Sequence, residues 1–391
     1  MLNLYRFANI FKRRPCMISC AVTTSFLGCL VTMFLFIRYV WFLGLSPLAN
    51  AAALVALLLI GCFPLLVSYR FENALGSLYP CYRYGLYYVF ISAIILLTLT
   101  LVTDAVWFAG YKFGWFDCLP YSREFCIKYN LWLVGAAALF GAYALYAGTK
   151  IPDFKEITLS SPQINRKRTI VVLSDLHIHR VINPEKIKGI VAKTNAQNPD
   201  IILLAGDVID DNVKSVSSTI SLLKELKAKE GIYFVTGNHE FYAGYKPTVE
   251  TLKKLGFTFL ENGGVSLEDI YIAGIPDTFS GHFYGKNADL EKTFAESGNN
   301  RYRILLSHTP TDFGRQNNFN LEISGHTHGG QIFPFHILTL LHNKYLAGLY
   351  KMENNAHIYV TRGAGQWGPQ MRFLAPSEIT VIKLTPSKGN N

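Results

Sequence analysis

The second half of the chain holds five short apolar runs, and each run is followed by polar side chains that can bind a metal ion. The runs are rich in Ile, Val and Leu, which is typical of buried strands, and they cover residues 169–173, 201–204, 232–235, 304–306 and 319–323. The side chains that follow them are Asp175, His177, Asp207, Asn238, His239, His308, His326 and His328. In layered α/β folds, ligands bind just beyond the carboxyl ends of the strands. The pattern therefore predicts an α/β domain in which these side chains share one site.

This mixture of imidazole and carboxylate groups predicts transition-metal chemistry. The two groups together suit Mn, Fe or Zn ions, and the two oxygens of one carboxylate can bridge a pair of ions. Two ions about 3.5–4 Å apart can stabilise both the attacking and the leaving oxygen of a phosphoryl transfer. The alternative is that the histidines are scattered surface residues and the aspartates are helix caps, but five clusters in succession favour a metal site. We therefore expect two divalent metal ions, with Mn favoured.

The same residues form a series of motifs that resembles the calcineurin-like metallophosphoesterases. The family pattern is D-x-H, G-D-x-x-D, G-N-H-E, a single His and G-H-x-H, and all five blocks occur in that order between residues 168 and 384. The resemblance implies two sheets packed face to face with helices on their outer sides. Residues 329–331 with Pro334, and residues 359–363, resemble the membrane-associated branch of that family.

The resemblance also implies a role for each residue of the site. One metal ion would be held by Asp175, His177, Asp207 and His328. The other would be held by Asp207, Asn238, His308 and His326, so that Asp207 bridges the pair. His239 would face the phosphate and protonate the leaving oxygen, and Asp210 would orient a neighbouring residue through a hydrogen bond.

The residue after Asp210 departs from the family pattern. Many family members have Arg there, whereas this chain has Asp211, so one expected phosphate-binding cation is absent. His179, Arg180 and Arg362 are the candidates for contact with the substrate. The alternative for Arg362 is a structural ion pair, and the alternative for His179 is a position at the rim without a substrate role.

The first 150 residues have the composition of a membrane protein. They contain only fifteen charged side chains, eleven basic and four acidic, and so hold +7 of the total charge of +10. Four stretches are apolar enough to span a bilayer, which takes about 20 residues, and they cover residues 17–37, 50–68, 85–103 and 131–148. The last is short and rich in Ala and Gly, and its alternative is a buried core helix. Because the basic excess flanks these stretches and the second half shows no basic run interleaved with aromatic residues, we expect no nucleic-acid partner.

The distribution of Lys and Arg predicts the orientation of the chain in the inner (cytoplasmic) membrane. Lys12, Arg13 and Arg14 precede the first predicted span, which favours a cytoplasmic N-terminus. Four spans return the second half to the cytoplasm, whereas three would place it outside. The predicted organisation is a transmembrane domain over residues 1–149, a polar linker over 150–168 and a catalytic domain over 169–387.

All seven cysteines lie at or before Cys126. The second half therefore has no thiolate to bind metal or to act as a nucleophile. Cys118 and Cys126 lie in the predicted external loop, where a disulfide and two free thiols are both open.

The second half alternates helix-like and strand-like segments. The expected elements, besides the five runs above, are helices over 184–196, 213–229 and 247–255 and strands over 358–360 and 378–384. Residues 333–349 are apolar and aromatic, and they form either part of the core or a rim that contacts the membrane or a lipid chain. Residues 279–284 are a second candidate for such a rim.

Together these features predict a membrane-anchored dimetal phosphoesterase. A lipid-linked phosphoester is delivered in the membrane plane, where an anchored domain meets it, whereas a soluble substrate needs no anchor. The resemblance to the membrane-associated branch makes UDP-2,3-diacylglucosamine the most specific candidate, cleaved to UMP and 2,3-diacylglucosamine 1-phosphate in lipid A synthesis. The alternatives are a phosphodiesterase acting on another lipid-linked or nucleotide-linked phosphate, a phosphoprotein phosphatase, and a membrane receptor or binding module whose phosphoesterase domain is inactive. The oligomeric state is left open.

Overall fold

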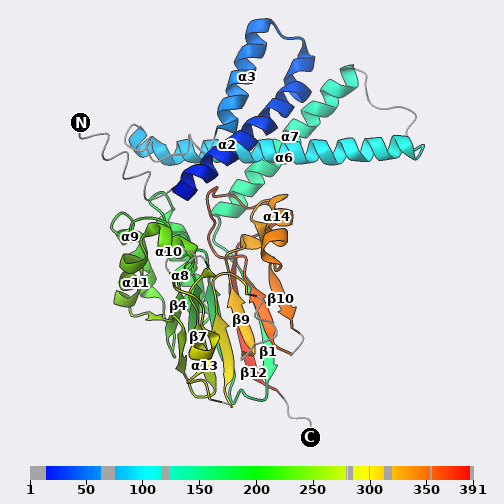
Figure 1. Ribbon diagram of the computed structural model, residues 1–391. Helices are drawn as coiled ribbons and strands as arrows, with labels where there is room; N and C mark the ends of the chain where they lie inside the picture. Colours follow the sequence, from blue (N-terminus) through cyan, green and yellow to red (C-terminus); the bar gives the residue numbers. More distant parts are fainter. Residues whose placement is uncertain are drawn as a thin grey trace. The chain divides into compact units, whose positions relative to one another are not determined.

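The computed structural model describes residues 15–62, 75–115, 123–278, 280, 285–298, 300–311, 319–352 and 355–387. The chain divides into two compact units, Met1–Leu145 and Tyr146–Asn391. The first unit is helical, and the second contains two β-sheets with their helices (Figure 1). The boundary between the units lies close to residue 150, where the composition of the sequence changes.

The described part of the first unit is built mainly from long helices. They are α2 (Pro15–Leu35), α3 (Pro47–Gly61), α6 (Tyr79–Lys112) and α7 (Arg123–Thr149), with the short helices η1 (Phe36–Val40), η2 (Trp41–Leu43) and η4 (Gly76–Leu78) between them. Within the described residues, two helical segments are long and apolar enough to cross a membrane, Gly76–Lys112 and Cys126–Thr149. The apolar segments Ser25–Val40 and Pro47–Gly61 are shorter, and residues 63–68 of the second predicted span lie outside the described residues.

The structure shows Cys29, Cys62, Cys81 and Cys126 of the first unit as free thiols. Cys29 and Cys62 lie where α2 and α3 meet, with their sulfur atoms 3.6 Å apart. The helices approach closely here, because a Cβ atom on Gly28 would overlap the carbonyl oxygen of Gly61, and small residues are what allow such contacts between membrane helices. Cys126 is also free, and Cys118 lies outside the described residues, so the predicted alternatives for that pair stay open.

The second unit contains two six-stranded sheets. The first has the order β1-β12-β2-β3-β4-β5 and the second the order β10-β11-β9-β8-β7-β6. The strands are β1 (Asp153–Ser161), β2 (Arg168–Leu173), β3 (Ile201–Ala205), β4 (Ile232–Val235), β5 (Thr258–Phe259), β6 (Gly263–Ser266), β7 (Ile270–Gly274), β8 (Tyr302–Leu306), β9 (Leu321–Ser324), β10 (Gly348–Lys351), β11 (His357–Val360) and β12 (Glu378–Pro386). The strands that precede the predicted ligands run parallel to one another within each sheet, β2 with β3 and β3 with β4 in the first, and β8 with β9 in the second.

Alternating side chains of the central strands form two layers of the core. Ile170 and Val172 of β2 pack with residues of both sheets, such as Ile304 of β8 and Ile323 of β9, and so fill the space between the sheets. Val171 and Leu173 pack on the other face, against the helices. Both faces of β2 are therefore buried, which explains why its sequence is a continuous apolar run rather than an alternating one.

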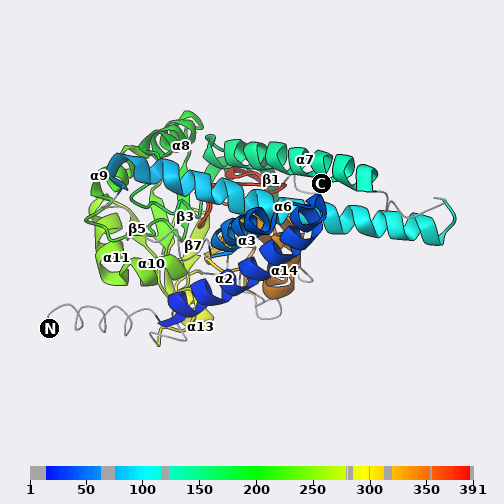
Figure 2. The same ribbon diagram turned by 90° about the horizontal axis from the view of Figure 1, so that it is seen from above.

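Helices cover the outer face of the first sheet. They are α8 (Pro184–Ala196), α9 (Ser217–Ser221), η5 (Leu222–Glu225) and α11 (Tyr245–Lys254), and their apolar residues join the same core layer as Val171. Viewed from above, α9 and α11 lie beyond β5, along this side of the unit (Figure 2). The predicted helix over 184–196 agrees with α8, and the one over 247–255 nearly matches α11. The helix predicted over 213–229 is shorter in the structure, where the helical residues are 217–225.

Part of the predicted linker is a strand. Residues 153–161 form β1, which pairs in parallel with β12 along nine residues at the edge of the first sheet. The linker prediction was wrong here because β1 is an edge strand with mostly exposed or half-exposed side chains, so its sequence is polar. The apolar stretch predicted over 279–284 lies largely outside the described residues.

Candidate metal centre

Loops at the carboxyl ends of five strands bring the predicted ligands together. The loop after β2 carries Asp175 and His177, the loop after β3 carries Asp207, β4 leads into Asn238 at the start of α10 (Asn238–Ala243), β8 leads into His308, and β9 leads into His326 and His328. Backbone hydrogen bonds fasten these loops to one another. The amides of Asp175 and His177 donate to the carbonyl oxygens of Gly206 and Asp207, at 3.1 and 3.0 Å.

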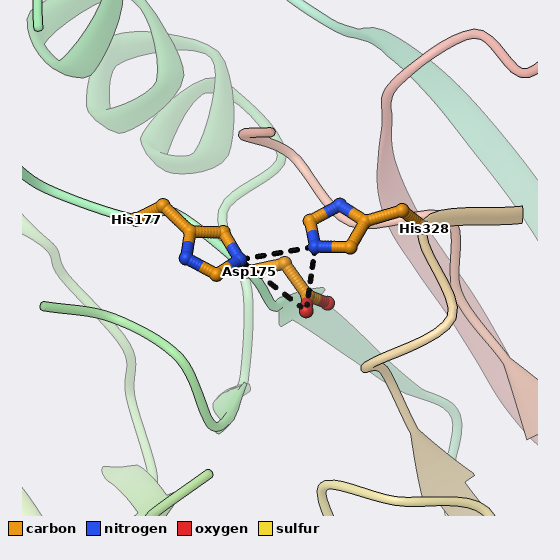
Figure 3. Close-up of side chains that lie close together, drawn as sticks. All are labelled: Asp175, His177 and His328. Carbon is orange, nitrogen blue, oxygen red and sulfur yellow. Dashed lines mark hydrogen bonds and ion pairs between the residues drawn. The ribbon is translucent and has the colours of Figure 1, made fainter. Parts of the chain in front are cut away.

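Asp175, His177 and His328 form a first cluster (Figure 3). The Nε2 atoms of the two histidines lie 3.0 Å apart. Oδ1 of Asp175 is 3.4 Å from Nε2 of His328 and 3.9 Å from Nε2 of His177. All three side chains are buried, and one donor atom from each lies within 4.8 Å of the others. One ion can therefore be reached by all three.

Asp207, His308 and His326 form a second cluster beside Asn238. Nε2 of His308 is 3.1 Å from Oδ2 of Asp207 and 3.3 Å from Nδ1 of His326. The same Nδ1 is 3.1 Å from Oδ1 of Asn238. These four side chains present imidazole, carboxylate and amide donor atoms toward one point.

Asp207 joins the two clusters. Its Oδ2 atom lies 3.1 Å from His308 of the second cluster and 3.8 Å from His177 of the first. Its Oδ1 atom accepts a hydrogen bond of 2.8 Å from the backbone amide of His239, which fixes the direction of the carboxylate. This is the position that a bridging ligand needs.

The hydrogen bonds of the histidines determine which ring nitrogens face the clusters. Nδ1 of His308 is 2.8 Å from the carbonyl oxygen of Ala205, and because a carbonyl only accepts, Nδ1 carries the proton. Nε2 of the same ring faces Oδ2 of Asp207 at 3.1 Å. Burial lowers the pKa of His308, but the charge of Asp207 outweighs burial and raises the pKa well above the usual value, so a positive charge is stabilised between these two atoms. A metal ion can supply that charge in place of the proton, and a hydrogen bond that fixes Nδ1 is common in metal-binding histidines. The residues present therefore fit a pair of divalent ions.

Asp210 holds His177 and His239 in place. Its Oδ1 atom is 2.7 Å from Nδ1 of each ring, and the two rings meet edge to face with centroids 4.7 Å apart. Burial lowers the pKa of His239, but the negative charges of Asp210 and Asp207 outweigh burial and raise the pKa to about 9. The geometry thus supplies a protonated histidine beside the first cluster, and the predicted orienting role of Asp210 extends to two histidines.

For Asp207, His326 and His328, the surroundings favour the protonation states that metals bind. Burial raises the pKa of Asp207, but the positive charge of His308 and of nearby histidines outweighs it and keeps the pKa well below the usual value. Burial is also the main reason why the pKa of His328 is well below, and that of His326 below, the usual value. An ionised carboxylate and neutral imidazoles are the forms that coordinate a metal ion.

The three predicted substrate contacts have protein partners in the structure. Arg180 makes a two-pronged ion pair with Asp211, with N···O distances of 2.8 and 2.9 Å. Asp211, which stands at the sequence position where many relatives have Arg, therefore binds an arginine from another loop. NH1 of Arg362 is 2.9 Å from Oε2 of Glu378, and His179 is buried with Nε2 2.8 Å from the side-chain amide nitrogen of Gln370.

Glu240 and Arg372 were not assigned roles from the sequence. The buried carboxylate of Glu240 accepts hydrogen bonds from the backbone amides of Asp207, Val208, Ile209 and Gly237, at 2.7–3.0 Å. It ties the loop after β3 to the loop after β4. The signal in the sequence was its place directly after His239, in a motif whose other polar residues all belong to the site.

Arg372 supports the loop of the last ligand pair. Its side chain is fully buried, and NH1 donates to the carbonyl oxygen of His328 at 2.8 Å while NH2 lies 3.2 Å from Nδ1 of the same residue. NH2 also donates to the carbonyl oxygens of Arg362 and Gly365. No motif in the sequence marks this residue, because most of its partners are backbone carbonyl groups, which every residue type carries.

Comparisons with known proteins find metallophosphoesterases. The family model of the calcineurin-like phosphoesterases matches residues 168–330. An uncharacterized metallophosphoesterase from Helicobacter pylori is 36% identical over 275 residues, which are 69% of this chain and 74% of that protein. A transmembrane protein with metallophosphoesterase domain from Danio rerio is 32% identical over 266 residues, 64% of this chain and 61% of that protein.

Solved structures show a distant likeness. The crystal structure of a dimetal phosphatase from Danio rerio matches with a TM-score of 0.36 and 11% identity, over 56% of this chain and 99% of that one. A 5'-nucleotidase precursor from Thermus thermophilus matches with the same TM-score of 0.36 and 16% identity, over 56% of this chain and 54% of that one.

Proposed function

Because the chain belongs to the calcineurin-like metallophosphoesterase family, we propose that it is a membrane-anchored dimetal hydrolase of phosphodiesters or pyrophosphates. One observation carries the proposal. The carboxylate of Asp207 lies between two buried clusters of donor atoms, 3.1 Å from His308 on one side and 3.8 Å from His177 on the other. Such a carboxylate at the junction is what two adjacent ions require.

The residues divide between the two ions as follows. Asp175, His177 and His328 would hold the first ion with one oxygen of Asp207. Asn238, His308 and His326 would hold the second with the same carboxylate. When bound, the ions would lower the pKa of water toward neutrality and neutralise charge on the phosphoryl oxygens. Mn, Fe and Zn all suit these ligands, and Mn is our first choice for assay.

His239 is proposed as the proton donor to the leaving group. Asp210 holds Nδ1 of its ring, which leaves the other ring nitrogen to transfer a proton to the departing oxygen as the phosphorus–oxygen bond breaks. A pKa of about 9 keeps the ring protonated at neutral pH. Asp210 orients the ring and does not exchange the proton itself. His179, Arg180 and Arg362 remain candidates for the rim that receives the rest of the substrate.

The substrate proposal is a phosphoester of a membrane lipid. Two helices long and apolar enough to cross a membrane, and a relative named as a transmembrane protein, support an anchored enzyme. Within this class UDP-2,3-diacylglucosamine is the most specific candidate. We further propose four spans with the second unit in the cytoplasm, on the asymmetry of Lys and Arg. A reporter fused to the C-terminus that is active only outside would overturn this orientation.

The proposal is tested by comparing Asp207→Asn with His239→Ala in the purified full-length protein. Asp207→Asn removes the shared carboxylate, so both bound metal and turnover fall. Activity within about tenfold of the wild type, equivalent to about 1.4 kcal/mol of barrier, would refute the dimetal assignment. His239→Ala lowers turnover but leaves metal content unchanged, and loss of metal in this variant would make His239 a ligand instead.

Two substrates separate the chemistry from the natural substrate. UMP release from UDP-2,3-diacylglucosamine, abolished by Asp207→Asn, would support both parts of the proposal. Cleavage of only a generic chromogenic phosphodiester would support the chemistry and contradict the lipid nucleotide. Binding of metal without cleavage of either substrate would favour the binding-module alternative.

A further inference from the structure

Helix α14 (Phe335–Asn343) has its apolar side turned outward. The exposed fractions of its aliphatic side chains are 56% for Ile337, 62% for Leu338, 46% for Leu340 and 79% for Leu341. No residue of the helix is buried. An amphipathic helix of a water-soluble domain places such residues against the core, and α14 does the opposite.

Three of the four polar residues of α14 are partly covered, whereas the fourth, His342, is exposed. His336, Thr339 and Asn343, at spacings of three and four, are the side chains of the helix that are partly covered together. Nε2 of His336 is 3.4 Å from the carbonyl oxygen of Leu374, and Asn343 donates to the carbonyl oxygen of Thr339. Of these two contacts, the one made by His336 joins the helix to another segment of the second unit, and the one made by Asn343 lies within the helix. The aliphatic side of α14 is exposed.

Both ends of this excursion are anchored beside the metal ligands. A Cβ atom on Gly330, two residues after His328, would lie 2.5 Å from Cα of His336, so the first turn of α14 packs directly on the ligand loop. Beyond the helix, the carbonyl oxygen of Leu346 accepts a hydrogen bond of 2.6 Å from Thr327 Oγ1. The segment therefore begins just after His328, and its far end is held against Thr327, which lies between His326 and His328.

Two further exposed apolar residues connect α14 to the site. Leu374 is 64% exposed, and its carbonyl oxygen contacts His336. Trp367 is 52% exposed, its backbone exchanges hydrogen bonds with the side chain of Gln331, and its ring lies 6.4 Å from that of His239. We call α14 with Leu374 and Trp367 the apolar rim. Exposed apolar patches of this kind mark interaction sites.

The charges around the apolar rim indicate which partner covers it. The chain has no Asp or Glu from residue 323 to residue 352, whereas this range contains Lys344 and Lys351. An apolar helix that is followed by Lys344 and contains no acidic residue suits the surface of an anionic bilayer. The first strand of the unit begins at Asp153, four residues after α7 ends at Thr149, so a helix that can cross a membrane lies close along the chain.

We propose that α14 is an interfacial helix, which lies in the headgroup region of the bilayer with its aliphatic side chains among the acyl chains. The inference rests on the proposed membrane anchoring and extends it. The helix brings the mouth of the metal centre, beside Trp367, to the depth of lipid phosphates. The surface thereby selects phosphoesters presented by the membrane over those dissolved in water.

Spin labels on the full-length protein in anionic proteoliposomes test the placement. The native cysteines, all at or before Cys126, are replaced, and single cysteines are introduced by Leu338→Cys, Leu341→Cys and, as the control, Glu250→Cys on the exposed side of α11. We expect the labels on α14 to collide readily with oxygen and poorly with a water-soluble nickel complex, and the control label to do the reverse.

Each other outcome contradicts the proposal. Ready access of nickel to labels at 338 and 341 would mean that the helix faces water. Exclusion of both reagents would mean that protein covers it, from the first unit or from a second copy. The labels report position whether or not the protein turns over substrate, so a failure of the proposed activity is seen separately, in the comparison with Asp207→Asn.

A kinetic test uses two acidic substitutions on the same helix. The double variant Leu338→Glu with Leu341→Glu should lower turnover of a diester lipid in vesicles, relative to a water-soluble diester, by about tenfold or more, because burial of one Leu side chain alone changes an equilibrium by about that factor. Lys254→Glu, which places the same charge on exposed α11, should leave this ratio unchanged. An equal ratio in the double variant and the wild type would overturn the proposal.

Discussion

Backbone conformation is unusual at most of the candidate metal ligands. The φ angle is positive at Asp175 (55°), His177 (47°), Asp207 (51°), His326 (68°) and His328 (51°). Each such residue costs about 1 kcal/mol or more relative to the ordinary helical or extended regions. These positions are held by backbone hydrogen bonds between loops and by the buried Glu240 and Arg372. The fold thus uses part of its stability to direct five ligands toward two points.

Gly325 tests how closely the ligand loops must approach. A Cβ atom at this position would overlap Oγ of Ser174 and lie 2.5 Å from Oδ2 of Asp175. Gly325→Ala should therefore displace the carboxylate of Asp175 and weaken metal binding by about 10–100-fold, the range seen when the support of a ligand is lost. Metal titration of the purified protein measures the change.

Gly263 provides the matched control for this substitution. It lies in strand β6 of the second sheet, and the nearest atom to an added Cβ is the carbonyl oxygen of Glu261 at 4.0 Å. Gly263→Ala should bind metal as the wild type does. If Gly325→Ala also bound metal normally, close packing on Asp175 would have no part in forming the site.

The candidate ligands could be predicted from the sequence because a chemical pattern repeats along it. A short buried strand followed by His or Asp is visible in a single chain, and five repeats identify one edge of the sheets. The supporting residues were harder to find, because Arg372 acts through backbone carbonyl groups of His328, Arg362 and Gly365. Contacts of that kind depend on the path of the chain and leave no mark in the pattern of residue types.

At the scale of elements, Arg168 connects the amino-terminal ends of the two sheets. It begins β2, its side chain is fully buried, and Nε and NH1 lie 3.1 Å from Glu230 and 2.5 Å from Asp269. Glu230 precedes β4 of the first sheet, and Asp269 precedes β7 of the second. This ion pair network lies at the ends of the strands opposite to the ligand loops.

Arg168→Met should lower the free energy of unfolding of the second unit by about 3–5 kcal/mol, because it leaves the carboxylate of Asp269 buried without its partner. Chemical unfolding of the full-length protein in detergent measures the loss. Arg166→Met is the control, since Arg166 also pairs with Glu230 but its side chain is 47% exposed, and exposed pairs contribute less than about 1 kcal/mol. Adding Asp269→Asn to Arg168→Met should recover part of the stability. A double variant as unstable as the single one would show that packing of Arg168, rather than its charge, matters.

Elements could be predicted where their residue types match their burial. The strands β2, β3 and β4 are apolar on both faces and α8 has a clear start at Asn183 and Pro184, so the sequence locates them well. The edge strand β1 and helix α14 were not predicted from the sequence, because β1 is largely polar and α14 carries its apolar residues on the outside. The partner of β1 is β12, which is far away along the chain, and the partner of α14 is the surroundings of the apolar rim. Neither partner can be read from the residues next to the element.

At the scale of the whole molecule, charge is divided unequally between the two units. Most of the excess positive charge belongs to the first 150 residues, where two helices of the described part are long and apolar enough to cross a membrane. The number of spans could not be derived from composition alone, because an apolar stretch does not reveal how long its helix is. The described helix α3 ends at Gly61, and residues 63–68 of the second predicted span lie outside the described residues.

Lys186 on α8 makes the stability of the second unit depend on pH. Its ammonium group is buried and donates hydrogen bonds of 2.6 Å to the carbonyl oxygen of Gly148 and to Oε1 of Gln366. Both acceptors are uncharged, so burial, aided by the charge of Arg372, lowers the pKa of Lys186 to about 7. The unfolded chain has the ordinary lysine pKa of about 10.4. Between pH 7 and pH 10 the unfolded state therefore binds more protons, and stability rises with pH.

Lys186→Met should remove this dependence. Relative to the variant, the wild-type protein should gain up to about 1.4 kcal/mol of unfolding free energy for each pH unit above 7, the limit for one proton. Below pH 7 the wild type carries the full cost of the buried charge, and the difference between the two proteins is constant. Thermal unfolding from pH 6 to pH 9 measures the two curves, with Lys188→Met as the control, because Lys188 is exposed on the same helix and pairs with Glu185. Parallel curves for the wild type and Lys186→Met would mean that Lys186 keeps an ordinary pKa, and that its contacts with Gly148 and Gln366 hold a charged amine at no cost.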